Sequence, residues 1–247
     1  VTGVVTADTA WLLNHVFGQP PTQSGSGPYT YAWDITSGRV QSARFYAGLD
    51  YLNGYAERVL KGTVFPQIDF ECAIAEGVQY TATGFFGDED RDTSATPGTA
   101  PTTTSDAFVF HGGSLSLDGS DLKKMQSGTL SIQTGAHPHR GWGRKPVDAA
   151  IGAVNHTLTP TKIVDSVDLL DLTHGGSSGP ADDVAPADGS LAFTNGSDTL
   201  TFPLTRAKPN SHSWDAIGNA DEDVTESPEL YVDEVDAELE TDTAEAL

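Results

Sequence analysis

FPQIDFECAIAEGVQYTAT, residues 65–83, alternates between apolar and polar side chains along both of its halves. An alternation with a period of two residues is typical of a half-buried β-strand. Gly77 lies between the halves and supplies the positive φ that hairpin turns require. The stretch therefore predicts a long β-hairpin with one apolar and one polar face. Its β-branched and aromatic content disfavours the alternative of an interrupted helix.

The apolar face of this hairpin is expected to lie in the protein core. A shift of the strand by one residue would expose all of its apolar side chains, so the pattern specifies which face is buried. Cys72 is the single cysteine and has no partner for an intrachain disulfide. We expect it to be a small buried hydrophobe rather than a nucleophile. The residues predicted on the core face of the first strand are Ile68, Phe70, Cys72 and Ile74.

The composition describes a protein that is acidic but able to fold. The 247 residues fit one large β domain or two small ones, and 37% hydrophobic residues are enough for a core. The formal net charge of -22 argues against tight binding to nucleic acid through its phosphates. No stretch approaches the ~20 apolar residues that span a bilayer, so no membrane partner is expected. Because the chain begins with Val1 and its one methionine is Met125, we expect the initiator to have been removed.

Acidic residues are abundant and lysines are scarce. The chain holds 35 Asp and Glu residues against 13 Lys and Arg residues. This balance resembles proteins of salt-loving archaea and their viruses, because carboxylates hold water and cations at molar salt, where charge repulsion is screened. The alternative is an ordinary acidic protein. Thirteen of the 35 acidic residues follow Trp214, which predicts an acidic C-terminal segment over residues 215–247 whose last ten residues fray.

The remaining chain predicts many short strands and few helices. Residues 6–17 suit a short helix that Gly18 ends. Three stretches poor in apolar residues are expected to be long loops, at 88–105, 135–146 and 173–190. The fold class is therefore mainly β, a β-sandwich or barrel with one or two short helices and long loops, in a single domain over residues 1–247. Strands are expected at 29–35, 40–46, 49–60, 107–110, 114–117, 128–133, 154–158, 162–172, 191–194, 199–205 and 230–237.

No set of residues composes a catalytic site, so the sequence predicts no enzyme and no cofactor. His137 and His139 are the best metal candidates, but no carboxylate or cysteine stands at partner spacing. Exposed loop histidines, or a contact loop that uses the neighbouring arginine and tryptophan, are the alternatives. Paired acids such as Asp168 and Asp171 lack the spacing of a calcium loop, so no specific metal is predicted.

An ordered series of elements runs from Ala7 to Gln133. It consists of LLNHVFG at 12–18, Tyr29–Thr30–Tyr31, a G-x-x-hydrophobic-N element at 48–53, the amphipathic hairpin, and LSLDG at 115–119 followed by SGTLSI at 127–132. This order resembles that of the tail tube proteins of long-tailed double-stranded DNA viruses. From Gly135 onward the resemblance is weaker, and the loop at 173–190 and the acidic C-terminus depart from the family pattern.

The resemblance implies a structural protein of the virion tail. Subunits of that family form rings, and because this chain carries no clear duplication, six copies per ring are expected. The rings stack into a hollow tube whose inner sheets close into a β-barrel, through which the genome passes during ejection. The implied partners are further copies of the chain, the tape-measure protein, and tail terminator and baseplate proteins, with DNA passing without specific binding. The composition suggests a haloarchaeal host.

In such a tube the polar face of the central hairpin is expected to line the lumen. A wall without Lys or Arg would not hold the phosphates of the genome. Two other functions stay open on the sequence: an acidic decoration or cell-surface binding module of a halophile, and an enzyme with a metal at His137 and His139. The residues predicted to face the lumen are Gln67, Asp69, Glu71, Gln79, Thr81 and Thr83.

Overall fold

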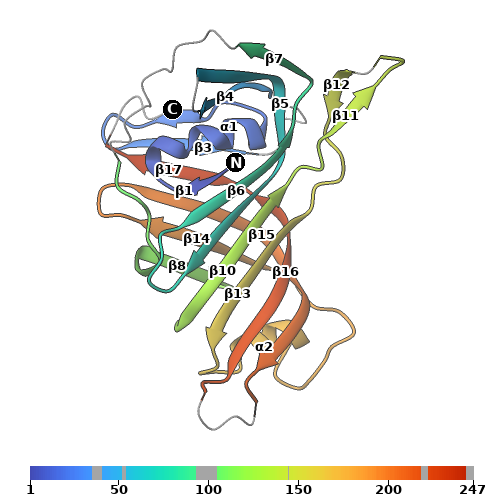
Figure 1. Cartoon of the computed structure of the whole chain (residues 1–247). Helices are drawn as coiled ribbons and strands as arrows, with labels where there is room; N and C mark the ends of the chain where they lie inside the picture. Colours follow the sequence, from blue (N-terminus) through green and yellow to red (C-terminus); the bar gives the residue numbers. More distant parts are fainter. Residues whose placement is uncertain (35–40, 52–53, 93–104, 144, 218–221, 243–247) are drawn as a thin grey trace.

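The computed structural model describes the chain except for residues 35–40, 52–53, 93–104, 144, 218–221 and 243–247 (Figure 1). Nearly all strands belong to one large antiparallel sheet that folds into two layers, which confirms the predicted mainly β fold class. The strands are β1 (Thr2–Val4), β2 (Thr22–Ser24), β3 (Tyr29–Trp33), β4 (Ala43–Tyr51), β5 (Gly54–Ala73), β6 (Gln79–Phe85), β7 (Asp88–Asp92), β8 (Gly113–Leu117), β9 (Ser120–Asp121), β10 (Met125–Gln133), β11 (His137–Arg140), β12 (Pro146–Ala150), β13 (His156–Ile163), β14 (Ala187–Thr194), β15 (Thr199–Asp215), β16 (Thr225–Val235) and β17 (Ala237–Thr241). The helices are α1 (Trp11–Phe17) and α2 (Asp168–His174), with 3-10 turns η1 (Ala7–Thr9) and η2 (Phe110–Gly112).

The predicted hairpin is the pair β5 and β6. Ile68 lies opposite Ala82 and Asp69 opposite Thr81, so apolar and polar side chains separate as the alternation predicts. The turn differs from the prediction, because Ala75 and not Gly77 takes the positive φ, at 65°. Ile74 belongs to this turn and is 50% exposed, so its placement on the core face was wrong.

The first layer follows the order β1, β6, β5, β10, β13, β16 and the C-terminal part of β15. Near Ala207 the long strand β15 passes from this layer to the second one, where its N-terminal part pairs with β14 and β17. Arg206 adopts a φ of 58° at this point, where the pairing with β14 shifts its register. The second layer also holds β8, β9, β3 and β2.

The core lies between the two layers and is made of apolar side chains from both. The rings of Phe70 on β5 and Phe202 on β15 have centroids 4.8 Å apart. Leu130, Leu158 and Leu230, on three neighbouring strands of the first layer, are at most 1% exposed. Burial of this apolar area is the main favourable term in folding.

Helix α1 packs against β5 and β3. Its apolar side is buried and consists of Leu12, Leu13, Val16 and Phe17, and Gly18 ends the helix in the left-handed conformation, as predicted. The 3-10 turn η1 covers the first part of the predicted helix. The indole nitrogen of Trp33 donates a hydrogen bond of 2.7 Å to the side chain of Asn14, which ties the helix to β3.

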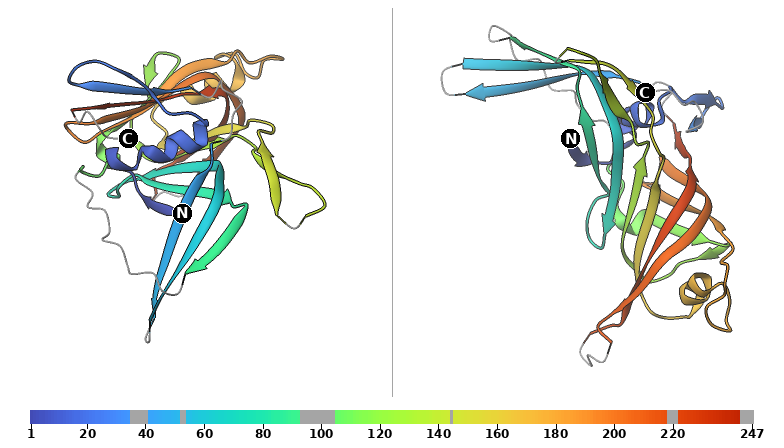
Figure 2. Two further views of the ribbon diagram at one scale, coloured as in Figure 1. Left: turned by 90° about the horizontal axis from the view of Figure 1, so that it is seen from above. Right: turned by 90° about the vertical axis from the view of Figure 1, so that its right-hand side faces the viewer.

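All three predicted loops contain residues that belong to strands. Residues 88–92 form β7, which pairs with one edge of the N-terminal part of β5, while β4 pairs with the other edge. This three-stranded extension projects from the body (Figure 2). Its salt bridges include Arg58 with Glu89, 2.7 Å apart, and Lys61 with Asp90. Most of the rest of the 88–105 stretch lies outside the described residues, as do Leu52 and Asn53 of the predicted G-x-x-hydrophobic-N element.

The predicted loop at 135–146 is instead largely the hairpin of β11 and β12, a separate two-stranded sheet that forms an arm. Residues 168–174 form α2, so the strand expected at 162–172 is wrong beyond Ile163. The third predicted loop, 173–190, is wrong at residues 173–174, which belong to α2, and at 187–190, which belong to β14. Asp168 and Asp171 place carboxylates in the first turn of this helix, a favourable position beside the helix dipole.

The acidic C-terminal segment is part of the fold. Its strand β16 lies inside the first layer, and β17 joins β15 to β3. Leu239 and Thr241 are at most 1% exposed, so the predicted fraying is wrong as far as Thr241. Carboxylates alternate with apolar residues there, which lets an acidic strand bury one face. The single-domain assignment over residues 1–247 stays a prediction.

Candidate functional site: the polar face of the first layer

Four neighbouring strands of the first layer, β6, β5, β10 and β13, present one continuous face of polar side chains. Strand register places Thr81 beside Asp69, Asp69 beside Ser131, and Ser131 beside Thr157. The rows of residues on either side of this one are also polar. We call this surface the polar face, and its residues are Gln67, Asp69, Glu71, Gln79, Thr81, Thr83, Thr129, Ser131, Gln133, Thr157, Thr159 and Thr161.

All six residues predicted from the hairpin lie on this polar face. The sequence prediction missed the contribution of β10 and β13. The signal was present, because Thr129, Ser131 and Gln133 alternate with buried leucine and isoleucine, and threonine recurs at 157, 159 and 161. The expected role of the face as a lumen wall stays a prediction at this point.

A hydrogen-bond cluster lies at the centre of the polar face. The Ser131 hydroxyl donates to the Asp69 carboxylate at 2.5 Å, and the Gln67 amide donates to both of its oxygens at 2.9 Å. The Gln133 amide donates in turn to the Ser131 hydroxyl at 3.2 Å. Neutral donors therefore satisfy Asp69 without a cation, and hydrogen bonds to a carboxylate are of the stronger, charge-assisted kind.

The charge on the polar face is entirely negative. Asp69 and Glu71 are its only ionisable members, and Glu71 is exposed. Cations appear only where the layer continues into β16 and β15, and there they are paired: Arg206 contacts Asp233 at 2.7 Å and Lys208 contacts Asp183 at 3.2 Å.

The opposite side of the same strands faces the core, and three kinds of ionisable group are buried there. Cys72 is 9% exposed, which confirms the expectation of a buried cysteine, and burial raises the pKa of its thiol to about 11. His156 on β13 is 1% exposed, and burial lowers its imidazole pKa to about 4. Its Nδ1 accepts a hydrogen bond of 3.2 Å from the backbone N–H of Gln133, so the ring is neutral near pH 7.

The third group is a buried ionic cluster at the far end of β13. The Lys162 ammonium lies 2.7 Å from the Asp165 carboxylate and 3.5 Å from that of Glu226. Glu226 is 1% exposed, and its other oxygen contacts Nε2 of His212 at 3.0 Å. Buried charges in proteins persist only when paired, and here each has a partner of opposite sign or a hydrogen-bonding ring.

The two candidate metal ligands lie on the β11–β12 arm. Their imidazole centroids are 5.2 Å apart, and Nδ1 of His137 lies 3.2 Å from the carbonyl oxygen of Gly135. Over the described part of the chain, no group of three or more His, Cys, Asp or Glu side chains is placed to hold a metal ion. Within the same part, neither helix is long and apolar enough to cross a membrane.

Comparison with protein families supplies the decisive observation. The sequence model of the phage tail tube protein family matches residues 1–238, nearly the whole chain. The chain belongs to the phage tail tube protein family. No curated protein matches it at a significant level. As a tail tube protein it is a structural component of the virion tail. The match extends beyond Gln133, so the resemblance that weakened there continues through the arm, α2 and β16.

Proposed function

We propose that copies of this tail tube protein assemble into hexameric rings that stack into a tube, and that the polar face lines the lumen through which DNA is ejected. The observation that carries the proposal is the polar face itself. It spans four adjacent strands, and it holds two carboxylates and no Lys or Arg among its members. The proposed partners at the tube ends and inside it are the tape-measure, tail terminator and baseplate proteins.

The chemistry of the polar face suits a surface past which DNA moves. A protein that neutralises phosphates with Lys or Arg gains affinity for DNA with each contact. Threonine, serine and glutamine side chains are polar but uncharged and offer no such contact. The carboxylates of Asp69 and Glu71 repel phosphates weakly. DNA would therefore pass without a binding step that slows its movement.

The edges of the first layer support ring formation. At one side β1 covers only the Gln79–Thr81 end of β6. At the other side, pairing of β15 with β14 ends at Ala207, while β15 continues to Asp215 beside β16. Exposed strand edges invite pairing with another chain, and closure into a barrel satisfies them. Neighbouring subunits would join these two sides.

Electron microscopy of the purified protein tests the proposal. We expect rings and tubes at high salt, with six subunits in end-on class averages and the polar face toward the channel in a reconstruction. Monomers at every concentration, below and above molar salt, would contradict it. Rings with a different number of subunits would support the proposed tube and overturn the proposed number of six.

We further propose a haloarchaeal virus as the source, because the net charge is -22. The Debye length grows from ~3 Å in 1 M salt to ~10 Å in 0.1 M salt, so carboxylates repel over longer distances in dilute salt. Melting temperature should therefore rise across a salt series. A flat or falling series would rule out this adaptation.

A further inference from the structure

The arm formed by β11 and β12 presents an unpartnered aromatic side chain. Trp142 lies between the two strands at the tip of the hairpin and is 109% exposed. Val147 beside it on the arm is 77% exposed. Tryptophan is enriched at the centres of protein interfaces, and a tryptophan held fully in water on a projecting hairpin is suited to contact another molecule.

The arm is also a basic segment of an acidic chain. Residues 137–147 read HPHRGWGRKPV and include no Asp or Glu, in a protein of net charge -22. The ammonium of Lys145, just before the start of β12, lies 2.6 Å from Asp88, a contact that ties the tip end of the arm to β7. Any contact between two copies of so acidic a chain brings like charges together, and this segment is one that avoids that cost.

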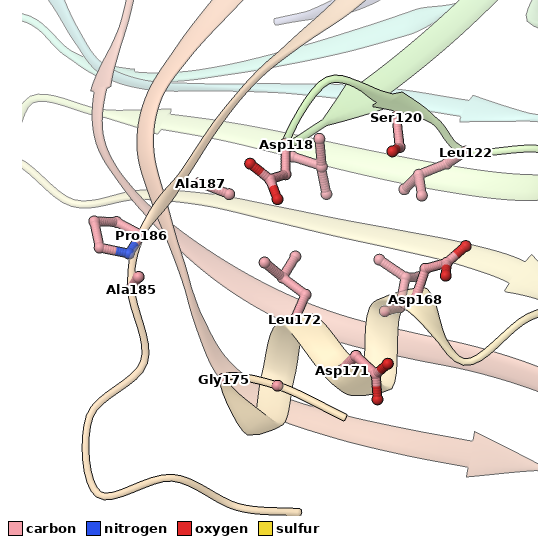
Figure 3. Close-up of a pocket in the computed structure, with 13 residues that line it drawn as sticks. Asp118, Ser120, Leu122, Asp168, Asp171, Leu172, Gly175, Ala185, Pro186 and Ala187 are labelled. Carbon is pink, nitrogen blue, oxygen red and sulfur yellow. The ribbon is translucent and has the colours of Figure 1, made fainter. Parts of the chain in front are cut away.

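A pocket of about 430 Å³ lies between α2 and the β8–β9 turn. Its apolar lining comes from Leu117, Leu122, Leu169 and Leu172, and its polar lining is acidic. Figure 3 shows Asp118 above the pocket and Asp168 and Asp171 on α2 below it. The lining contains no Lys, Arg or His.

The arm and the pocket lie at opposite ends of the molecule in both side views (Figures 1 and 2). A chain therefore cannot place Trp142 in its own pocket. A contact between one end of a molecule and the other end of its neighbour is heterologous, and such contacts repeat into an open filament. This is the geometry by which rings would stack.

We propose that the arm of one subunit docks into the pocket of a second copy in the adjacent ring, with the Trp142 indole on the leucine floor and the segment 137–147, which is free of Asp and Glu, facing Asp118, Asp168 and Asp171. The apolar floor suits the indole, and the acidic rim suits a segment that adds no carboxylate of its own. This inference rests on the proposed stacking of rings and assigns to it a specific contact.

The first test compares Trp142→Ala with Val154→Ala, a truncation of another exposed apolar side chain. Because Trp142 is fully exposed, its removal should leave the melting temperature unchanged. It should raise the protein concentration needed for tubes by about tenfold or more, since interface anchors have effects of this size. The control should assemble as the wild type does.

The second test mixes two variants that each add one cysteine, Gly143→Cys and Ser120→Cys. A Cβ at Gly143 meets nothing within 4 Å, and Ser120 lines the pocket, so both positions accept the change. The native Cys72 is buried with a raised thiol pKa and adds little background. Oxidised tubes from the mixture should contain disulfide-linked dimers, whereas a mixture of Gly143→Cys with Val154→Cys should not.

The outcomes separate this contact from the proposed function. Tubes that form normally with Trp142→Ala and give no cross-link would overturn the contact and leave the tube intact. Rings that form but fail to stack in Trp142→Ala would support it. Wild-type protein that forms neither rings nor tubes would overturn the proposed function and this contact with it.

Discussion

The two faces of the sheet formed by β6, β5, β10 and β13 treat polar groups in opposite ways. The core face is apolar, and the charged groups that it buries are held by oppositely charged partners, as Lys162 is by Glu226. The polar face keeps its carboxylates in contact with neutral donors, as Asp69 is with Ser131 and Gln67. Its charge is therefore left uncompensated.

Acidic residues therefore have separate roles on the two faces of the sheet. On the core face a carboxylate is part of the architecture, because an unpaired charge there would destabilise the fold. On the polar face the Asp69 carboxylate has neutral donors, and in the proposed function its charge repels the phosphates of DNA. Changes at the two faces should accordingly differ in kind, affecting stability in one case and passage of DNA in the other.

The largest effect is expected from Lys162→Met. This substitution leaves the Glu226 carboxylate buried without its cation, and breaking a buried ion pair in this way costs about 3–5 kcal/mol. Unfolding in denaturant at constant high salt measures the loss. The double variant Lys162→Met with Glu226→Leu removes both charges and should recover much of it. A single variant as stable as the wild type would show that the cluster is not a compensated pair.

A smaller effect is expected from paired truncations on adjacent residues of β10. Leu130 is fully buried, and Leu130→Ala should lower the free energy of unfolding by about 3 kcal/mol. Thr129 points to the polar face, and Thr129→Ala should change it by less than about 0.5 kcal/mol. Equal losses in the two variants would mean that both faces are packed, which would contradict the comparison.

The next effect concerns pH. Burial lowers the pKa of His156 from 6.5 to about 4. Between these pH values the unfolded chain binds a proton at His156 that the folded chain does not bind. This group costs the folded state no stability above pH 6.5, and the free energy of unfolding declines as pH falls toward 4, by about 3 kcal/mol. His156→Asn keeps an acceptor for the backbone N–H of Gln133 and should remove this part of the pH dependence. The difference between wild type and variant cancels the titration of the carboxylates, and a constant difference would contradict the assignment.

The sequence predicts one sheet face better than it predicts connections. Alternation in residues 65–83 places Phe70 and Asp69 on opposite faces, because a period of two residues is a property of the strand itself. Ile74 fails because the strand ends at Ala73, and a turn removes the residue from the pattern. Residues 88–92 carry charges typical of a loop, yet they form a strand that pairs with β5. A salt bridge between residues distant in the sequence, Arg58 with Glu89, accompanies the pairing.

The candidate site is recoverable only in part for the same reason. The threonines of β13 become members of the polar face through pairing with β10, which is a long-range contact. The acidic C-terminus illustrates the limit most clearly. Composition predicts a frayed end for this acidic segment, whereas the alternation of Leu230 and Val232 predicts the strand that lies inside the first layer as β16. Average charge is a weaker guide to burial than the order of residues within a strand.

Labelling of the polar face tests whether this face lines the lumen of the tube. Glu71→Cys places a thiol on the polar face at an exposed position, in a chain whose native Cys72 is buried. In assembled tubes we predict that a small iodoacetamide reacts while a large polyethylene glycol maleimide does not, and that both react once the tubes are dissociated. Equal reaction of the two reagents with intact tubes would place the polar face on the outside and contradict the account.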